Sequence, residues 1–328
     1  MVLGTADRGV LANLNDYDID TADIDPALLG SGDFDGGLWG LPTGGNIIAM
    51  MADPQIFDEA GVEMPDDTTW TWEDYADLMQ QISENTPEGV YGAQNLGIHD
   101  AHLMVWLRQH GQELWAADGG TGFDTATVAE YWQMSLDMMD SGAIPPASLA
   151  VEVDAGGPEQ SLVATNNGAI STFWTNQLAA VAGAAGRDLQ LLRFPGEAQF
   201  DRTGLYVKAS MLLTMSADTE HPEAAALFLN WMQNSTEAGE IILSDRGLPS
   251  NLQVREHILP QLSEVEQQAA EFIEEVSQDV VDAPPAPPRG AGQVVDLMFR
   301  INEEVIFGQI TPEEGAERLL EEAQSLIG

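Results

Sequence analysis

Short apolar runs alternate with helical patterns along most of this chain, and no other feature of the sequence constrains its fold as tightly. The runs 47–51, 168–173 and 189–193 have the length of buried strands and are bounded by turn residues. Between them, apolar residues recur at helical spacing, as in 103–110 and 128–139. This alternation predicts the α/β class, and a length of 328 residues suits two domains.

Prolines, glycines and capping residues mark where several predicted elements begin and end. Pro54 predicts the start of a short helix that ends near Gly61. Thr71 predicts the cap of another helix, with Asp74 in its first turn. Residues 283–288 hold too many prolines for a helix or a central strand, so they predict a rigid extended connector.

The segment 205–231 predicts one strand and one helix, and two closing helices separated at Gly308 and Pro312 are predicted after the proline-rich connector. The apolar run 205–215 predicts a single strand that is closed by a turn. Pro222 predicts a helix start, and the spacing of Ala224, Phe228 and Trp231 predicts the buried face of that helix.

The charge balance is extreme, because 54 acidic residues face 11 basic ones and give a formal net charge of −43. Lys208 is the only lysine. Phosphate binding needs a basic surface, so this balance excludes nucleic acid as a partner and disfavours an anionic membrane surface. Spread acidity with almost no lysine is typical of proteins from concentrated salt, where screening relieves self-repulsion. A halophilic source is therefore a hypothesis.

Several kinds of chemistry are absent from the sequence. There are no cysteines, which excludes disulfides, thiolate metal sites and cysteine nucleophiles. The nucleophile motif GxSxG, the phosphate-binding P-loop and the dinucleotide motif GxGxxG are all missing. We therefore expect no cofactor, and we expect the protein not to be an enzyme.

The acidic run 16–25 invites comparison with a calcium loop. Thr21 stands where an EF-hand needs glycine, and Ala27 stands where it needs a glutamate. His99, His102 and His110 lack the carboxylate–histidine motif of a zinc site. The acidic run thus predicts a solvated loop, and we expect no metal site.

Seven segments, taken in order, carry a resemblance to a known family. They are 40–42, 57–61, 71–75, 106–112, 167–170, 221–229 and 308–314. Together they resemble the family-1 extracellular solute-binding proteins, the sugar-type receptors of ATP-binding-cassette (ABC) importers. The similarity covers nearly the whole chain, although Ala52-Asp53 replaces an Asn-Lys pair that is usual in the family.

The resemblance implies two α/β lobes in the type II periplasmic-binding-protein arrangement, joined by a hinge. The implied crossings lie near 44–48, 206–209 and 248–251. Lobe one would then comprise 1–45 and 207–250, and lobe two 46–206 and 251–328. The chain begins within what the family's first lobe would contain, so lobe one is expected to be incomplete at its N-terminus.

The resemblance also implies a function and a location. The protein would capture a carbohydrate between the lobes and deliver it to the membrane permease subunits of an ABC importer, as a monomer. It would be extracellular or periplasmic and, in its full-length form, anchored as a lipoprotein. No signal peptide is visible at the start of the sequence, and no apolar run is long enough to span a membrane.

A sugar site needs aromatic faces for the apolar side of the ring, with amides and carboxylates for the hydroxyls. Such residues occur at the ends of predicted strands, the usual lining of clefts in α/β proteins. The candidate ligand-binding residues are Asn46, His99, Asp100, Phe173, Trp174, Asn176, Tyr206 and Arg289.

Each candidate also has a purely structural explanation. Asn46 could cap a turn, and Asp100 could cap the helix that follows, with His99 in solvent. Trp174 could belong to the lobe-two core, and Tyr206 could point either way. Arg289 could bind an acidic ligand or pair with a surface carboxylate.

Three alternatives to a sugar receptor remain open on the sequence. The chain could bind another small solute, such as a polyol, a glycerophosphodiester or an oligopeptide. It could be a carbohydrate-active enzyme, because acidic pairs are numerous enough to supply a glycosidase dyad. It could also be a truncated remnant without function.

Overall fold

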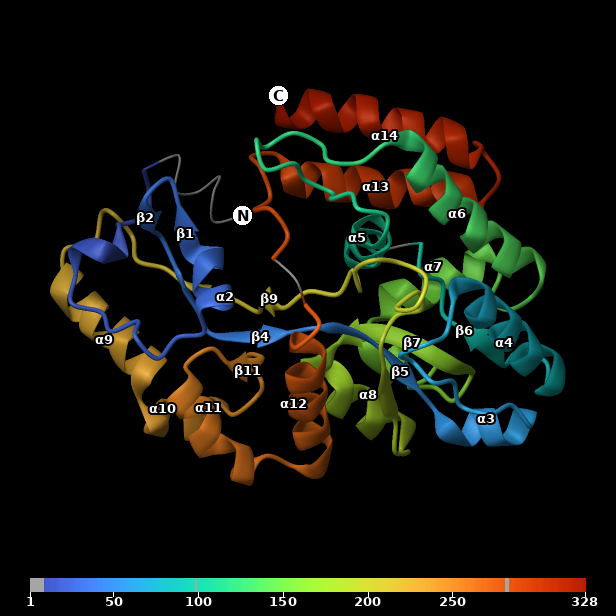
Figure 1. Cartoon of the computed structure of the whole chain (residues 1–328), viewed down its shortest axis with the longest axis horizontal. Coiled ribbons are helices and arrows are strands. Elements are labelled where there is room, and N and C mark those ends of the chain that lie inside the picture. Colours follow the sequence, from blue (N-terminus) through green and yellow to red (C-terminus); the bar gives the residue numbers. More distant parts are fainter. Residues whose placement is uncertain (1–8, 98, 281–282) are drawn as a thin grey trace.

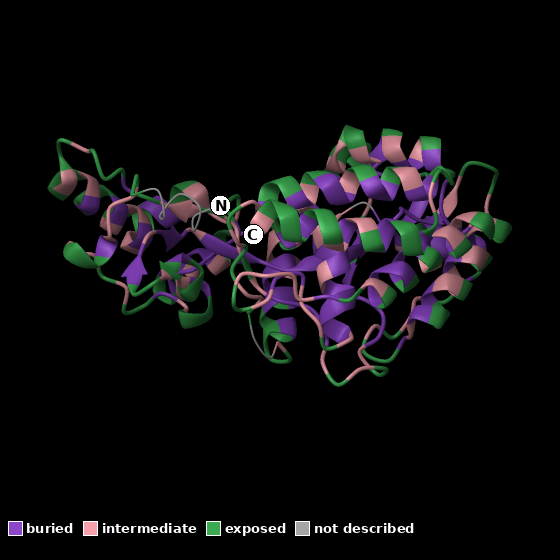
Figure 2. Cartoon of the chain, turned by 90° about the horizontal axis from the view of Figure 1, so that it is seen from above, coloured by how far each residue is buried: buried purple, intermediate pink, exposed green. Residues whose placement is uncertain are grey.

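The protein is organised as two lobes joined by extended segments. The computed structural model describes residues 9–97, 99–280 and 283–328. Figure 1 shows α2, α9, α10 and α11 in the smaller lobe, and α3 to α8 with α13 and α14 in the larger one. Figure 2 shows the smaller lobe extending to one side of the larger, with buried faces turned inward in both.

The described elements alternate between strands and helices along the chain. The strands are β1 (Asp33–Phe34), β2 (Gly37–Leu38), β3 (Leu41–Pro42), β4 (Gly44–Asn46), β5 (Ile48–Ala52), β6 (Tyr91–Ala93), β7 (Gly168–Trp174), β8 (Gln190–Leu192), β9 (Lys208–Ala209), β10 (Leu212–Leu213) and β11 (Leu248–Pro249). The α-helices are α2 (Pro26–Leu29), α3 (Pro54–Ala60), α4 (Trp72–Asn85), α5 (Asp100–Gln109), α6 (Thr125–Asp140), α7 (Ala147–Gly156), α8 (Leu178–Ala185), α9 (Pro222–Asn234), α10 (Thr236–Ile242), α11 (Leu252–Ile258), α12 (Glu264–Ser277), α13 (Ala291–Ile306) and α14 (Pro312–Ile327). The predicted α/β class and two-lobe arrangement are confirmed.

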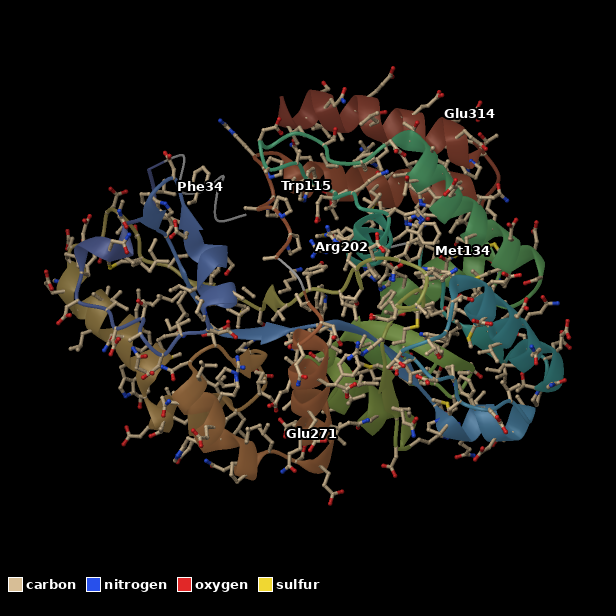
Figure 3. All side chains as sticks on the ribbon, in the orientation of Figure 1. Phe34, Trp115, Met134, Arg202, Glu271 and Glu314 are labelled. Carbon is tan, nitrogen blue, oxygen red and sulfur yellow. The ribbon has the colours of Figure 1, made fainter. Side chains whose placement is uncertain are left out.

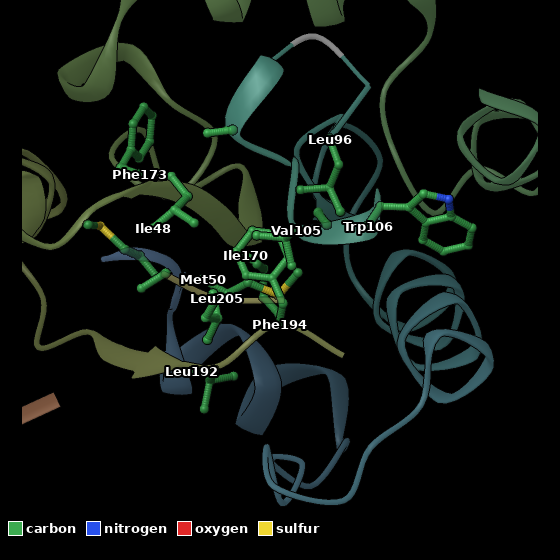
Figure 4. Packing of buried hydrophobic residues seen from close by; sticks show 14 of the residues in the cluster. Ile48, Met50, Leu96, Val105, Trp106, Ile170, Phe173, Leu192, Phe194 and Leu205 are labelled. Carbon is green, nitrogen blue, oxygen red and sulfur yellow. The ribbon is translucent and has the colours of Figure 1, made fainter. Parts of the chain in front are cut away.

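A four-stranded sheet forms the centre of the larger lobe, in the order β6-β7-β5-β8. β5 pairs antiparallel with β7 and β8, whereas β6 runs parallel to β7. All five residues of β5 are buried, because α3, α4 and α12 pack against neighbouring strands. Figure 4 shows the core that results, in which Ile48, Met50, Ile170 and Phe194 meet.

The smaller lobe has its own core. Leu14, Ile24, Leu38, Leu41, Met215 and Leu229 are buried together there. β1 and β2 form a hairpin whose turn residues Asp35 and Gly36 have φ angles of 48° and 74°. The strands of this lobe are short and its core is small, so α9 contributes Leu229 and Ala225 to the buried apolar cluster.

A three-stranded antiparallel sheet joins the lobes, in the order β11-β4-β9. These strands lie in the three segments that the resemblance implies as crossings, and β4 continues directly into β5 of the larger lobe (Figure 1). Gly44 is required here, because a Cβ on it would lie 2.7 Å from the carbonyl oxygens of Arg246, Gly247 and Leu248. The hinge role of these strands stays a prediction.

Most predicted boundaries are confirmed. α3 begins at Pro54 and is ended by Gly61, whose φ of 67° is left-handed. Thr71 and Asp74 form a reciprocal capping box at the start of α4. Residues 283–288 adopt neither helix nor strand, as expected of a proline-rich connector.

The prediction of one strand over 205–215 is wrong. Two short strands occur instead, because β9 pairs with β4 while β10 pairs with β3. Since β3 and β4 belong to different sheets, the chain must leave one sheet at Ser210 and Met211 before it enters the other. An apolar run cannot reveal such a change of partner.

The predicted buried face of α9 is also wrong. Phe228 and Trp231 stack on each other with 57% and 38% of their surface exposed. The helix instead buries Ala226, Leu229 and Gln233. α9 carries two apolar stripes, and the sequence does not say which of them meets the small core.

α11 lies in the smaller lobe although it opens the range 251–328. It packs against α10 and β11 (Figure 1), whereas α12 packs against α8 and β8. The lobe boundaries stay a proposal, and these contacts favour a division between α11 and α12.

Candidate functional site

The three joining strands present one face that carries several of the candidate residues. Asn46 of β4 lies directly opposite Lys208 of β9. Directly opposed residues of an antiparallel pair share a face, so both side chains belong to the same side of this sheet. We call Asn46, Trp174, Tyr206 and Lys208 the junction face, because ring contacts join the remaining two residues to it.

Trp174 is the aromatic centre of the junction face. It ends β7, where it pairs with Ile48, and it is partly exposed. The ring of Tyr206 meets it edge-on, with centroids 6.2 Å apart at 72°. The Nζ atom of Lys208 lies 4.5 Å from the centroid of the Trp174 ring, a cation–π distance.

Asn46 lies beside Trp174 with only 5% of its surface exposed. Its Oδ1 accepts a hydrogen bond of 3.3 Å from the Thr175 hydroxyl. Its Nδ2 has no hydrogen-bond partner among the described residues, and exchanging the two amide ends would still leave one of them unpaired. A buried amide with a spare end is suited to a ligand hydroxyl or carboxylate.

Tyr206 is a buried residue whose ring packs against Trp174. It is 3% exposed, its hydroxyl contacts the Met104 sulfur at 3.5 Å, and the Arg108 guanidinium lies 5.5 Å from its ring centroid. Burial is the main cause that raises the pKa of Tyr206 far above its ordinary value of 10.0. The phenol therefore stays neutral and acts here as an aromatic surface.

His99 and Asp100 lie at the start of α5, and the charge of Asp100 is, after burial, the next cause that raises the pKa of Tyr206. His99 caps the helix by position but makes no side-chain cap hydrogen bond, and its Nε2 pairs with Asp154 at 2.9 Å. Burial lowers the pKa of His99, but the hydrogen bond and charge of Asp154 outweigh this, so the pKa lies above 6.5. The alternatives that Asp100 is the N-cap and that His99 is simply solvated are not what the structure shows.

The remaining three candidates occupy different environments. Phe173 is 9% exposed and packs in the larger-lobe core (Figure 4). Asn176 is exposed, and its Nδ2 donates a hydrogen bond of 3.4 Å to the Asp245 carbonyl oxygen of the smaller lobe. Arg289 is exposed just before α13, and it makes no ion pair with any residue that the structure describes.

The structure thus brings Asn46, Trp174 and Tyr206 together and leaves Phe173 and Arg289 outside the group. Lys208 and Thr175 were not among the candidates predicted from the sequence. The signal for Lys208 was present, because it is the only lysine and falls on a predicted crossing. Thr175 gave no signal of its own, since its role depends on the position of Asn46.

A groove with a volume of about 480 Å³ lies between α4 and α6. Its lining residues include Trp72, Trp106 and Met134, and Met134 is labelled in Figure 3 beside α6 and α4. Four carboxylates, those of Glu73, Asp77, Glu130 and Asp137, are among its lining residues. No junction-face residue lines it, and it lies within a single lobe.

Two general features limit the chemistry of the described residues. In the ranges 9–97, 99–280 and 283–328, no group of three or more His, Asp or Glu side chains is placed to hold a metal ion. No helix in those ranges is both long and apolar enough to cross a membrane. The junction face itself offers a ring, an amide and an ammonium group, which bind a ligand without covalent chemistry.

A family model described as bacterial extracellular solute-binding protein matches residues 2–238. The chain belongs to this family. The match spans most of the chain, including β4, β7, β9 and all four residues of the junction face. The resemblance inferred from seven short segments is therefore confirmed. The family consists of binding proteins that are extracellular or periplasmic.

Solved structures agree with the family assignment. A family-1 extracellular solute-binding protein from Alicyclobacillus acidocaldarius is 26% identical, with a TM-score of 0.79 over 99% of this chain and 81% of that chain. An oligogalacturonide-binding protein from Yersinia enterocolitica, in complex with saturated digalacturonic acid, is 18% identical, with a TM-score of 0.82 over 97% and 80%. An ABC substrate-binding protein from Listeria monocytogenes in complex with cycloalternan is 20% identical, with a TM-score of 0.80 over 99% and 82%. The last two likenesses establish the fold of this solute-binding protein.

Proposed function

We propose that this solute-binding protein captures a carbohydrate at the junction face and delivers it to the permease subunits of an ABC importer. The observation that carries the proposal is Trp174, a partly exposed indole that contacts Lys208 of the sheet that joins the two lobes. A sugar ring has an apolar face that packs on such an indole, while its hydroxyls need polar groups at the edge. Asn46 and Lys208 supply polar groups beside that ring.

The relatives give independent support. Two of the structures similar to this protein were solved with carbohydrates, a digalacturonic acid and a cycloalternan. Their identity to this chain is low, so they support a carbohydrate as the class of ligand and do not name the sugar.

The proposed mechanism is binding followed by closure of the lobes. A ligand that touches both lobes only when they are closed shifts the population toward the closed state. Three short crossing strands can absorb the required backbone rotation. The contact of Asn176 with the Asp245 carbonyl oxygen is one place where the lobes already meet.

A thermal-shift screen tests the class of ligand. Saccharides, polyols, glycerophosphodiesters and oligopeptides are each added at millimolar concentration, and the melting temperature is recorded. A ligand that binds only the folded state at about 100 times its Kd stabilises it by about 2.7 kcal/mol. The proposal expects a shift with saccharides alone, and a shift confined to another class would replace it. The remnant hypothesis expects no shift with any of them.

Turnover separates a receptor from a carbohydrate-active enzyme. The protein is incubated with the saccharide that gives the largest shift, and new reducing ends are measured over a day. A receptor releases none. Reproducible release that is lost on substitution of a single carboxylate would make the protein an enzyme.

Three finer points are part of the same proposal. The importer is tested by whether the liganded protein stimulates ATP hydrolysis by a reconstituted ABC importer that contains the candidate permease subunits. The monomeric state is tested by light scattering. Lipoprotein anchoring is tested by fatty-acid labelling of the protein expressed from its native gene, where an unlabelled product would exclude an anchor.

A further inference from the structure

Lys208 combines three properties that no other described residue shares. It is the only lysine of the chain, it is exposed, and it lies on β9 where the lobes join. It stands opposite Asn46, and its ammonium group lies over the Trp174 ring at 4.5 Å from the centroid.

The ammonium group of Lys208 has no carboxylate partner among the described residues. This is unusual in a chain with 54 acidic and 11 basic residues, where most described arginines are paired. The paired arginines include Arg187 with Asp53, Arg193 with Asp279, Arg202 with Glu113, Arg255 with Asp25 and Arg318 with Glu304. Arg289 and Arg300 also lack an ion pair within the described ranges, but neither lies over an aromatic ring there.

We propose that the ligand is an acidic saccharide, whose sugar ring packs on Trp174 and whose carboxylate is bound by Lys208. This inference rests on the proposed function and names the ligand class for the same face. A sugar on the indole places its substituents within reach of an ammonium group that already lies over that ring. The spare end of the Asn46 amide, on the same face, provides a second polar contact for the carboxylate or for an adjacent hydroxyl.

A ligand carboxylate would replace the Trp174 ring as the partner of the Lys208 ammonium group, and charge favours this replacement. An exposed ion pair is no stronger than an exposed contact between an ammonium and a ring, but a charged hydrogen bond strengthens when water is excluded, so Lys208 gains when the lobes close around an acidic ligand. The flexible four-carbon stem of lysine permits the necessary movement. The net charge of −43 opposes the approach of an anion, but that long-range repulsion is screened by salt, whereas contact at Lys208 acts over a few ångströms.

Matched saccharide pairs test the inference by isothermal titration calorimetry. Each pair has the same linkage and differs only in oxidation at C6. The pairs are α-1,4-galacturonate and α-1,4-galactose trimers, β-1,4-mannuronate and β-1,4-mannose trimers, and β-1,4-glucuronate and β-1,4-glucose trimers. The variants are Lys208→Gln, which removes the charge, Lys208→Arg, which retains it, and Arg318→Gln, a charge-matched control on the outer helix α14. The melting temperature of each variant confirms folding.

The inference expects the wild type to bind at least one uronate trimer about tenfold or more tightly than its neutral partner. Lys208→Gln should abolish that preference, Lys208→Arg should keep most of it, and Arg318→Gln should not change it. Equal affinity for both members of every pair, or a preference that survives in Lys208→Gln, would overturn the inference and leave a carbohydrate receptor in place. Failure of every saccharide to bind would overturn the proposed function as well.

Discussion

Phe173 and Trp174 are neighbours in sequence, yet the side chain of Phe173 is buried and that of Trp174 is partly exposed. Successive side chains of a strand point to opposite faces, so Phe173 enters the larger-lobe core and Trp174 reaches the junction face. The pairing register fixes this choice, because Phe173 lies opposite Ala49 and Trp174 lies opposite Ile48. A shift of one residue in that register would bury the indole and expose the phenyl ring.

The ion pair of His99 with Asp154 makes a prediction about pH. The pKa of His99 in the folded protein lies above the ordinary value of 6.5, so the pair contributes its full stabilisation below pH 6.5. That contribution is lost as the pH rises through the folded pKa. An NMR titration of the imidazole should therefore give a pKa above 6.5, which falls in Asp154→Asn. A pKa that is the same in both proteins would show that Asp154 does not control His99.

At the level of single residues, the positions of the aromatic candidates were easier to predict than the charge pairs. Trp174 and Tyr206 follow from strand ends and crossings, which local patterns reveal. The pairing of His99 with Asp154 and the lack of a partner for Lys208 depend on residues far away in the chain. No local pattern contains that information.

The joining sheet shows why glycine is needed where strands approach closely. A Cβ at Gly44 would lie 2.7 Å from three backbone carbonyl oxygens of the segment that leads into β11. A Cβ at Gly45 would lie 2.9 Å from the Val207 side chain, on the opposite face from Asn46. The two glycines therefore let β4 run between its neighbours without pushing them apart.

Substitution of Gly44 tests the importance of this approach. Gly44→Ala should destabilise the protein by about 1–3 kcal/mol, because backbone oxygens cannot move aside as a flexible side chain can. Gly183→Ala is the matched control within α8, where a Cβ would meet nothing within 4 Å. It should stabilise the protein by about 0.5–1 kcal/mol. Both are measured by urea unfolding, and a Gly44→Ala midpoint equal to that of the wild type would contradict the packing described.

At the level of elements, helix starts and buried strands were predictable, and pairing was not. Caps such as Thr71 with Asp74 act within four residues, so they are visible in the sequence. The split of 205–215 into β9 and β10 depends on β3 and β4, which lie more than 150 residues earlier. The buried face of α9 depends in the same way on the small core that it meets.

For the whole molecule, the net charge of −43 should make folding depend on salt. Repulsion among carboxylates acts over about 10 Å at 0.1 M salt and about 3 Å at 1 M salt. The melting temperature should therefore rise from dilute buffer to molar NaCl, and equally in KCl, since screening does not depend on the cation used. Higher stability in dilute buffer would refute both the argument and the hypothesis of a halophilic source.

In the proposed function, the junction face is important because it lies where the two lobes join. Residues from β4, β7 and β9 meet there, and a ligand held between the lobes could contact both. The sequence predicted the fold class and the family because their signals are spread along the whole chain. It did not predict which strands would pair with which, and the ligand depends on those pairings.

Isothermal titration calorimetry shows whether the carbohydrate binds on the ring of Trp174. The saccharide that shifts the melting temperature most is titrated into the wild type, Trp174→Ala and Trp231→Ala, the last being an equally drastic change at an exposed tryptophan on α9. Trp174→Ala should weaken binding by about tenfold or more, because the apolar face of the sugar loses its partner. Trp231→Ala should bind like the wild type. Unchanged affinity in a folded Trp174→Ala protein would show that the sugar binds elsewhere.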